Sequence, residues 1–315
     1  MRLFKLLPLA LIFALICSSC TLARKPAAPN INKQKYATEP TITVFFNDTG
    51  EKKRMKLEEY VLGVVAAEME PNWPINALAA QAILARTFAL ENIESGKVKK
   101  LHGTEVSTNI EESQAYDEKR ITANVRKAVQ MTRGQVVLYK GRFIKAWFNA
   151  CDGGISASAK EGLSYTKTPT PYVKELVKDG CLAVTIPENR HWRVAIPWDE
   201  VRNAVKSSIK QDPGPNPSVK ILSRGKSGRV LSMRVGAATI TAPALRLAIG
   251  PEKMRSTLLS KAAIENGKLV MEGKGFGHGV GLCQWGANKM AREGKSPEDI
   301  INFYYKDITI KKLWK

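Results

Sequence analysis

The residue best suited to acid–base chemistry is Glu68, which lies in the apolar segment Val64-Val-Ala-Ala-Glu-Met69. Three- and four-residue spacing places it on the same helical face as Val61, Val64 and Val65. Burial without a full charge partner raises the pKa of a carboxyl, so such a Glu can hold a proton at neutral pH. Glu68 is therefore a candidate general acid, for instance toward a glycosidic oxygen. The alternative is a solvated Glu that ends the helix and has no chemical role.

A second predicted helix, spanning 75–90, could bring two polar side chains toward the first. Ala79, Ala82 and Arg86 fall on one face of this segment, and small residues allow two helices to approach closely. Arg86 would then face the first helix, with Gln81 beside that face. The alternative for Arg86 is a bracing role between the two helices.

The most distinctive stretch of the chain is Gly275-Phe-Gly-His-Gly-Val-Gly-Leu-Cys-Gln-Trp-Gly286, called the glycine-rich motif below. Glycine at every second position from 275 to 281 permits positive φ and close backbone approach. Backbone amides and the side chains of His278, Gln284 and Trp285 could thus line a sugar-binding groove. Alternatively, His278 and Cys283 would form a thiol hydrolase pair, although Cys283 lacks an evident orienting partner.

Hydrophobic periodicity, with the glycines and prolines that interrupt it, predicts the elements that position these residues. Residues 57–69 and 75–90 form a helical hairpin, because Glu70-Pro-Asn-Trp-Pro74 ends the first helix and starts the second. We also expect strands at 42–46, 135–139, 142–148, 219–222, 230–235, 238–241 and 308–313, and helices at 127–131, 198–209, 284–293 and 297–305.

These elements predict an α+β fold. Its mixed sheet carries the helical hairpin, and a second, smaller α+β region precedes the glycine-rich motif and the C-terminal helices. We expect one domain at 41–315, with 192–272 as a subdomain within it. The two motif-bearing ends of the domain should meet at one groove.

The N-terminus indicates export. The short apolar run from Leu6 to Ile16 suits the core of a signal peptide spanning 1–20 better than a membrane span. Cys17-Ser-Ser-Cys20 resembles a lipoprotein cleavage site, so we expect lipidation at Cys20, with ordinary cleavage or an uncleaved anchor as alternatives. Residues 21–40 are rich in Pro, Ala, Asn and Lys without an apolar period, which predicts a tether.

The net charge and the cysteine content limit the kinds of binding partner and metal site that we expect. A formal net charge of +20 favours an anionic partner, and export removes nucleic acid from consideration. The chain has three further cysteines, at positions 151, 181 and 283. None of them forms the closely spaced Cys-x-x-Cys pair that structural zinc sites use, so we expect no metal and no cofactor. Cys151 and Cys181 are either a disulfide or two buried thiols.

Several motifs, in the same order, resemble those of the stage II sporulation protein D family, whose domain also occurs in amidase-enhancer proteins. The matching segments are 59–69, 78–90, 113–116, 153–154, 245–250, 254–256 and 277–287. The resemblance spans most of the chain after the N-terminal segment. Some members have a His and Cys cluster for zinc before the Gln-Ala-Tyr motif, whereas only His102 is present here, which again predicts no metal.

The resemblance implies a lytic transglycosylase that breaks the β-1,4 bond between N-acetylmuramic acid and N-acetylglucosamine and leaves a 1,6-anhydro end. Glu68 matches the catalytic acid of the family. Matching by motif position gives the substrate-groove candidates Gln81, Arg86, Gln114, Tyr116, Gly153, Gly154, Arg255, Ser256, His278, Gln284 and Trp285.

The resemblance implies that the substrate is peptidoglycan glycan whose stem peptides an amidase has removed, in wall remodelling during division or sporulation. The expected partners are therefore these glycan strands, a cell-wall amidase, and the membrane through a lipid anchor. The expected location is the cell envelope. The main alternative is a protein without catalytic activity that binds peptidoglycan and enhances an N-acetylmuramoyl-L-alanine amidase.

Overall fold

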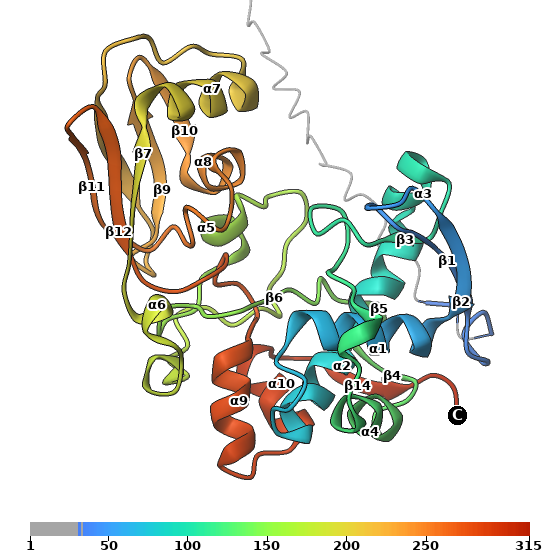
Figure 1. Ribbon diagram of the computed structural model, residues 1–315. Helices are drawn as coiled ribbons and strands as arrows, with labels where there is room; N and C mark the ends of the chain where they lie inside the picture. The colour runs from blue at the N-terminus through green and yellow to red at the C-terminus, as the bar shows by residue number, and fades with distance from the viewer. Residues whose placement is uncertain (1–30, 33) are drawn as a thin grey trace, which may run out of the picture.

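The computed structural model describes residues 31–32 and 34–315 (Figure 1). The expected signal peptide, lipidation at Cys20 and the first part of the tether lie outside these residues. Within the described ranges, no helix combines the length and apolar character needed to cross a membrane.

The fold begins with a small sheet that leads into the predicted helical hairpin. Strand β1 (Thr41–Phe45) pairs antiparallel with β2 (Lys52–Lys56) and parallel with β3 (Val106–Ser107). β2 runs directly into α1 (Leu57–Glu68), and the Pro-containing loop leads to α2 (Ile75–Ser95). The hairpin prediction is confirmed, and α2 continues one turn beyond its predicted end.

The C-terminal part of the chain returns to strands near its middle. β4 (Gln135–Tyr139) lies between β14 (Thr309–Lys312) and β5 (Arg142–Phe143), with antiparallel pairing on both sides. β6 (Phe148–Asn149) pairs in parallel with β13 (Leu282–Cys283). This second pairing places the glycine-rich motif beside the loop that follows β6.

Helices complete this part of the molecule, called the body below. They are α3 (Lys97–His102), α4 (Ala123–Met131), α5 (Ala159–Leu163), α6 (Pro187–Arg190), α9 (Gln284–Arg292) and α10 (Pro297–Tyr304), with 3-10 turns η1 (Glu118–Arg120) and η2 (Cys181–Ala183).

Helix α2 is the centre of the body. Every residue from Ala77 to Thr87 is buried, and α1, α4, α9, α10 and β4 all pack around the helix. A helix that is buried on all sides belongs to the interior of a fold. Polar residues on α2 therefore need partners inside the protein.

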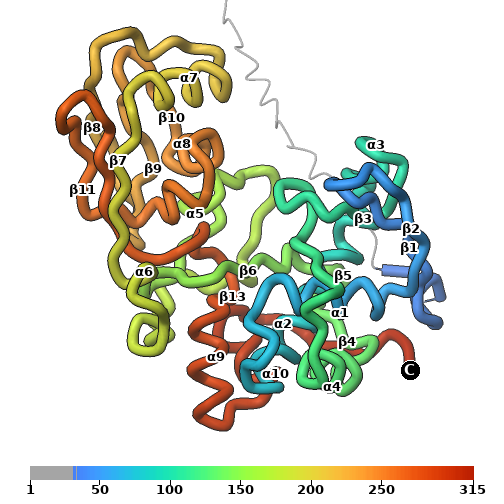
Figure 2. Tube along the Cα trace, viewed as in Figure 1, coloured from blue at the N-terminus to red at the C-terminus, as the bar shows by residue number. Residues whose placement is uncertain are grey.

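A second group of elements forms a lobe at the upper left of Figure 1 and Figure 2. It contains two three-stranded sheets, ordered β11-β12-β7 and β10-β9-β8, and two helices. Its elements are β7 (Trp192–Pro197), α7 (Trp198–Ile209), β8 (Val219–Arg224), β9 (Val230–Val235), β10 (Ala238–Thr241), α8 (Ala242–Ile249), β11 (Leu259–Glu265) and β12 (Lys268–Gly273).

The lobe has its own hydrophobic core, which is separate from the core around α2. We infer from the two cores that 192–272 is a subdomain inserted in the body. A buried carboxylate joins the two parts: Glu161 of α5 accepts hydrogen bonds from the backbone N–H groups of Lys226 and Ser227 and from the Ser227 hydroxyl.

Two sequence-based expectations differ from the structure. The tether does not extend to residue 40, because Tyr36 is buried against the body and its hydroxyl donates to Glu94. The strand expected at 142–148 is broken, since β5 ends at Phe143 and the chain crosses to pair with β13 as β6. The α+β class is confirmed, with several small sheets in place of one large one.

Candidate active site

Glu68 is the last residue of α1, and its carboxyl is held by the loop that contains the Gln-Ala-Tyr motif. The backbone N–H of Ala115 donates to Glu68 Oε1 at 2.9 Å. Burial raises the pKa of Tyr60 to about 12, and the charge of the Glu68 carboxylate adds to this rise. Glu68 is partly buried. The carboxyl is therefore hydrogen-bonded within the protein, and the side chain is still partly exposed to ligands.

The environment of Glu68 favours its protonated form. Desolvation by burial raises the Glu68 pKa to about 7, against the opposing effects of the Ala115 N–H and the Gln284 side-chain amide. Both opposing groups are neutral, so no full positive charge holds the carboxylate ionised. A carboxyl in this state can donate a proton near neutral pH and accept one afterwards.

The raised pKa makes a prediction about stability. A Glu whose folded pKa exceeds the unfolded value contributes stability below the unfolded pKa, and this contribution disappears as pH rises through the folded pKa. Glu68→Gln removes the titration, so the variant should gain about 1–3 kcal/mol on the wild type between pH 4 and pH 8. Urea unfolding of both proteins at the two pH values measures this change. An equal difference at both pH values would contradict the raised pKa.

An aromatic cluster fixes the loop that holds Glu68. The ring of Tyr116 stacks on Tyr60 with centroids 5.9 Å apart and meets Phe46 edge-on at 5.4 Å. The ring lies directly against Gly63 of α1, where an added Cβ would come within 2.2 Å of Tyr116 Cε2. The adjoining Asp117 N–H donates to the Gly63 carbonyl. Glycine at position 63 thus allows the loop to lie on the helix.

Gly63→Ala is expected to destabilise the fold by about 1–3 kcal/mol, because the new methyl group must displace the Tyr116 ring. This loss outweighs the gain of about 1 kcal/mol that Ala brings to a helix interior. In a Tyr116→Ala background the clash disappears, so the same substitution should become neutral or stabilising. Denaturant unfolding of the four proteins in this cycle measures both values. Equal losses in the two backgrounds would show that the ring contact is not the cause.

The glycine-rich motif reaches the same site from the other end of the chain. Gln284 is buried, and its side-chain amide lies close enough to the Glu68 carboxyl to lower the Glu68 pKa. The contact is longer or less well aligned than a regular hydrogen bond, since Gln284 Nε2 makes none within the described residues. The Trp285 ring meets Trp73 edge-on at 4.7 Å, and Trp73 belongs to the loop directly after Glu68. The two motif-bearing ends of the domain therefore meet.

Two other amides near this region are buried with unsatisfied atoms. Gln114 Nε2 donates to the Ala85 carbonyl, but its Oε1 has no partner in the described part of the chain. Neither polar atom of Gln81 has one there. Unpaired buried amides are rare in folded proteins and require an explanation such as an ordered water or a functional role.

Arg86 is not a groove residue, and this expectation needs correction. Its guanidinium is fully buried and donates to both carboxylate oxygens of Glu58, at 2.6–3.2 Å, and to the carbonyls of Ala82 and Gln135. Glu58 also accepts from the Gly134 N–H and from Trp314 Nε1. Arg86 therefore joins α1, α2, β4 and the C-terminus inside the core, as the bracing alternative required.

The proposed thiol hydrolase pair is also wrong. His278 Nδ1 accepts from the Val280 N–H, and burial together with Arg246 and Arg229 lowers the pKa of His278 to about 3. The Cys283 thiol is fully buried and accepts the N–H of Gly286 at the start of α9. Burial raises the pKa of Cys283, which favours the unreactive thiol.

The motif glycines adopt positive φ as expected, but they approach protein rather than an open groove. A Cβ at Gly277 would lie 2.7 Å from Asn149 Cβ, and one at Gly281 would lie 2.0 Å from the Trp147 carbonyl oxygen. Their main effect is to let the motif lie on the chain around β6.

Four further groove candidates support this packing. Gly153 and Gly154 have φ of 74° and 91°, and a Cβ at Gly153 would lie 3.1 Å from the Lys274 carbonyl oxygen. Ser256 donates to that same carbonyl, and Arg255 donates to Asn189 and stacks over Phe276. These contacts position the glycine-rich motif, and none of them is to Glu68.

Trp73 and the Ala115 N–H were missed by sequence reasoning. Trp73 carried a usable signal, because an aromatic residue between two prolines directly after a candidate acid is unusual. The Ala115 amide carried none, since a backbone donor has no side-chain identity.

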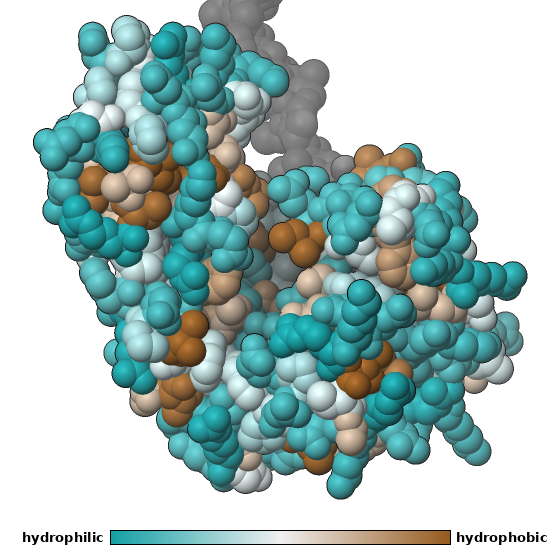
Figure 3. Space-filling view, in the orientation of Figure 1, coloured by the Kyte–Doolittle hydropathy of each residue, from teal (hydrophilic) through white to brown (hydrophobic). Residues whose placement is uncertain are grey.

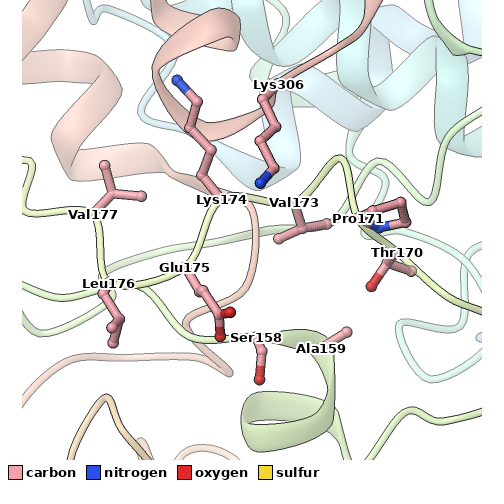
Figure 4. Close-up of a pocket in the computed structure, with 10 residues that line it drawn as sticks. All are labelled: Ser158, Ala159, Thr170, Pro171, Val173, Lys174, Glu175, Leu176, Val177 and Lys306. Atoms are coloured by element: carbon pink, nitrogen blue, oxygen red, sulfur yellow. The ribbon is translucent and has the colours of Figure 1, made fainter.

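The surface is hollowed between the lobe and the body (Figure 3). A separate pocket of about 570 Å³ lies under the loop 170–177, with Ser158, Ala159 and Lys306 completing its wall (Figure 4). Of the described residues predicted for the site, none lines this pocket. It is therefore distinct from the site at Glu68.

Fold and site together define an α+β protein with a single partly buried carboxyl as its candidate acid. Residues 47–139 match the family described as Stage II sporulation protein, and 185–281 match a domain of unknown function. The chain belongs to the stage II sporulation protein D family.

Relatives support this membership over most of the chain. An uncharacterised protein of Brachyspira hyodysenteriae is 32% identical over 257 residues, covering 81% of this chain and 67% of that protein. Stage II sporulation protein D of Bacillus subtilis is 28% identical over 312 residues, covering 92% and 84%. The amidase enhancer of Bacillus subtilis is 28% identical over 294 residues, covering 79% of this chain and 40% of the enhancer.

Proposed function

We propose that this chain is a lytic transglycosylase that cleaves the β-1,4 bond between N-acetylmuramic acid and N-acetylglucosamine in peptidoglycan glycan strands. The observation that carries this proposal is the Glu68 carboxyl, whose pKa is raised to about 7 by burial and which has only neutral hydrogen-bond partners. Family membership supports it independently.

One carboxyl is sufficient for this reaction. Protonated Glu68 donates its proton to the glycosidic oxygen, and the bond to C1 of N-acetylmuramic acid breaks as positive charge develops on that sugar. The Glu68 carboxylate then takes the proton of the C6 hydroxyl of the same sugar, whose oxygen attacks C1. The products are a free 4-hydroxyl and a 1,6-anhydro end, and Glu68 is again protonated. Water is not consumed, in contrast with the two-carboxylate scheme of ordinary glycosidases.

Neighbouring groups have supporting roles in this proposal. The Ala115 N–H orients the Glu68 carboxyl and stabilises it once it is ionised. The Gln284 side-chain amide lowers the Glu68 pKa and so also stabilises the ionised carboxylate. The rings of Trp73 and Trp285 provide an aromatic face on which a sugar can lie.

We further propose that the chain acts in the cell envelope, anchored through a lipid at Cys20. The net charge of +20 suits an anionic wall or membrane surface. A cell-wall amidase is the proposed partner, because a relative is named an amidase enhancer. Removal of stem peptides by that amidase would yield the glycan that this site cuts.

The second candidate function is enhancement of an amidase without catalysis, which the similarity to the amidase enhancer supports. The two functions differ in their products. Glycan strands without stem peptides are incubated in H₂¹⁸O with the wild type or with Glu68→Ala, and the products are analysed by mass spectrometry.

Anhydro ends without ¹⁸O from the wild type, and none from the variant, are the expected result. Products that carry ¹⁸O would identify a hydrolase. No cleavage by either protein, together with faster peptide release by an added amidase, would identify an enhancer.

A further inference from the structure

Three cysteines that are distant in the sequence meet inside the body. Cys151 follows β6, Cys181 begins η2, and Cys283 ends β13, and all three are buried and free. Their sulfur atoms all lie within 4.8 Å of one another, with Cys151 Sγ and Cys181 Sγ 3.5 Å apart. The parallel pairing of β6 with β13 brings Cys283 beside the loop that carries Cys151.

Two carboxyl groups adjoin the sulfurs. Asp152 and Asp179 lie within 4.8 Å of each other and of Cys181 and Cys283, and Asp152 Oδ1 is 3.3 Å from Cys181 Sγ. Asp179 is occupied, since it accepts from the Cys181 N–H and the Tyr304 hydroxyl. Asp152 is fully buried, and its Oδ2 has no hydrogen-bond partner among the described residues. An unpaired buried carboxylate oxygen is costly and needs a partner that the protein alone does not provide.

We propose that Cys151, Cys181, Cys283 and Asp152 bind a Zn²⁺ ion. In a tetrahedral site with Zn–S bonds of about 2.3 Å, neighbouring ligand atoms lie roughly 3.5–3.8 Å apart. Two pairs in the structure are close to these values: Cys151 Sγ and Cys181 Sγ are 3.5 Å apart, and Cys181 Sγ and Asp152 Oδ1 are 3.3 Å apart. Cys181 and Cys283 belong to both groups of donors, and no group contains both Cys151 and Asp152. An ion bound between Cys181 and Cys283 would therefore draw the Cys151 and Asp152 side chains toward each other to complete the tetrahedron.

Binding replaces thiol protons with the metal and releases them to solvent, and no electrons are transferred. Three thiolates and one carboxylate exceed the charge of the ion, and the fully buried Arg229 offsets part of this excess. Its guanidinium donates to the carbonyls of Asp152 and Ile155 and to no carboxylate in the described chain. A buried cation beside the ligands, paired only with carbonyls, is consistent with an anionic metal site.

The ion would join three segments that support the candidate active site. It ties the loop after β6 to η2 and to the first turn of α9, where Cys283 caps the helix that carries Gln284 and Trp285. The site is therefore structural, and it holds the Gln284 amide beside Glu68. This proposal departs from the expectation of no metal, which rested on the absence of closely spaced cysteine pairs.

The test uses the full chain, purified without chelators. Inductively coupled plasma mass spectrometry should find one zinc per chain, and competition with a chromophoric chelator gives its affinity. Cys181→Ser and Cys283→Ser should each weaken binding by about 100-fold or more, and Asp152→Asn by about 10-fold or more. Asp179→Asn is the matched control and should retain the wild-type affinity.

A second measurement needs only the wild type and so does not depend on the folding of any variant. X-ray absorption at the zinc edge of the wild type should show a first shell of three sulfurs and one oxygen, whereas a shell of nitrogen and oxygen alone would overturn the proposal. Zinc-free protein with a Cys151–Cys181 disulfide, detected by non-reducing peptide mapping, would also overturn it. Loss of affinity in Asp179→Asn but not in Asp152→Asn would disprove the assigned fourth ligand.

Discussion

Glu68→Gln is expected to lower the rate of glycan cleavage by about 10²–10⁴-fold, the usual contribution of a general acid–base group. The Gln amide has nearly the same shape and can still accept the Ala115 N–H bond, but it has no proton to donate to a leaving oxygen. Initial rates on glycan strands without stem peptides measure the loss. Binding of the same strands should change little, because the aromatic rings and amides of the site remain.

Glu70→Gln is the matched control for this substitution. Glu70 lies two residues further along and is exposed, and its side chain forms a surface ion pair with Arg120 at 3.4 Å. Its replacement should leave the cleavage rate unchanged. If Glu68→Gln kept the wild-type rate, or if both variants lost activity equally, Glu68 would not be the acid.

Arg86→Met is expected to destabilise the protein by about 3–5 kcal/mol, because it leaves the carboxylate of Glu58 buried without its cation. The Arg86 side chain is fully buried and the Glu58 side chain is 9% exposed, so water cannot replace the lost charge. The remaining donors, the Gly134 N–H and Trp314 Nε1, are neutral. Urea unfolding monitored by circular dichroism gives the free energy of unfolding of each protein.

The control for Arg86→Met is Lys289→Met, which removes the cation of an exposed helical pair with Glu293. That substitution should cost less than about 1 kcal/mol. A similar small loss in Arg86→Met would mean that the buried pair contributes little. If Arg86→Met instead folded with wild-type stability and lost most of its cleavage activity, Arg86 would have a role in the substrate groove.

Local signals in the sequence were sufficient for the helical hairpin. Apolar periodicity and the two prolines around Trp73 defined α1 and α2 almost to their ends, and the embedded Glu68 stood out against that pattern. The same periodicity could not reveal that α2 is buried on every side, which makes Arg86 a core residue. Burial on all sides depends on elements that arrive later in the chain, such as α9 and α10.

The pairing of strands that are distant in the sequence could not be predicted from local patterns. β6 and β13 are each two residues long, which is too short for a recognisable strand pattern. Their parallel pairing also joins positions more than a hundred residues apart. The meeting of Cys151 and Cys283 follows from that pairing, and η2 adds Cys181 to them. The antiparallel sheet of β7, β11 and β12 was predicted only as mixed α+β structure, because β7 is distant in sequence from the β11–β12 hairpin and the strands are partly exposed.

The most direct test is a titration of the Glu68 carboxyl by ¹³C NMR on protein labelled at the side-chain carbonyl carbon of glutamate. Comparison with Glu68→Gln assigns the signal. We predict a resonance, absent from the variant, that titrates with a midpoint near pH 7. A midpoint near the ordinary value of 4.5 would contradict a proton-holding Glu68 and, with it, the proposed mechanism.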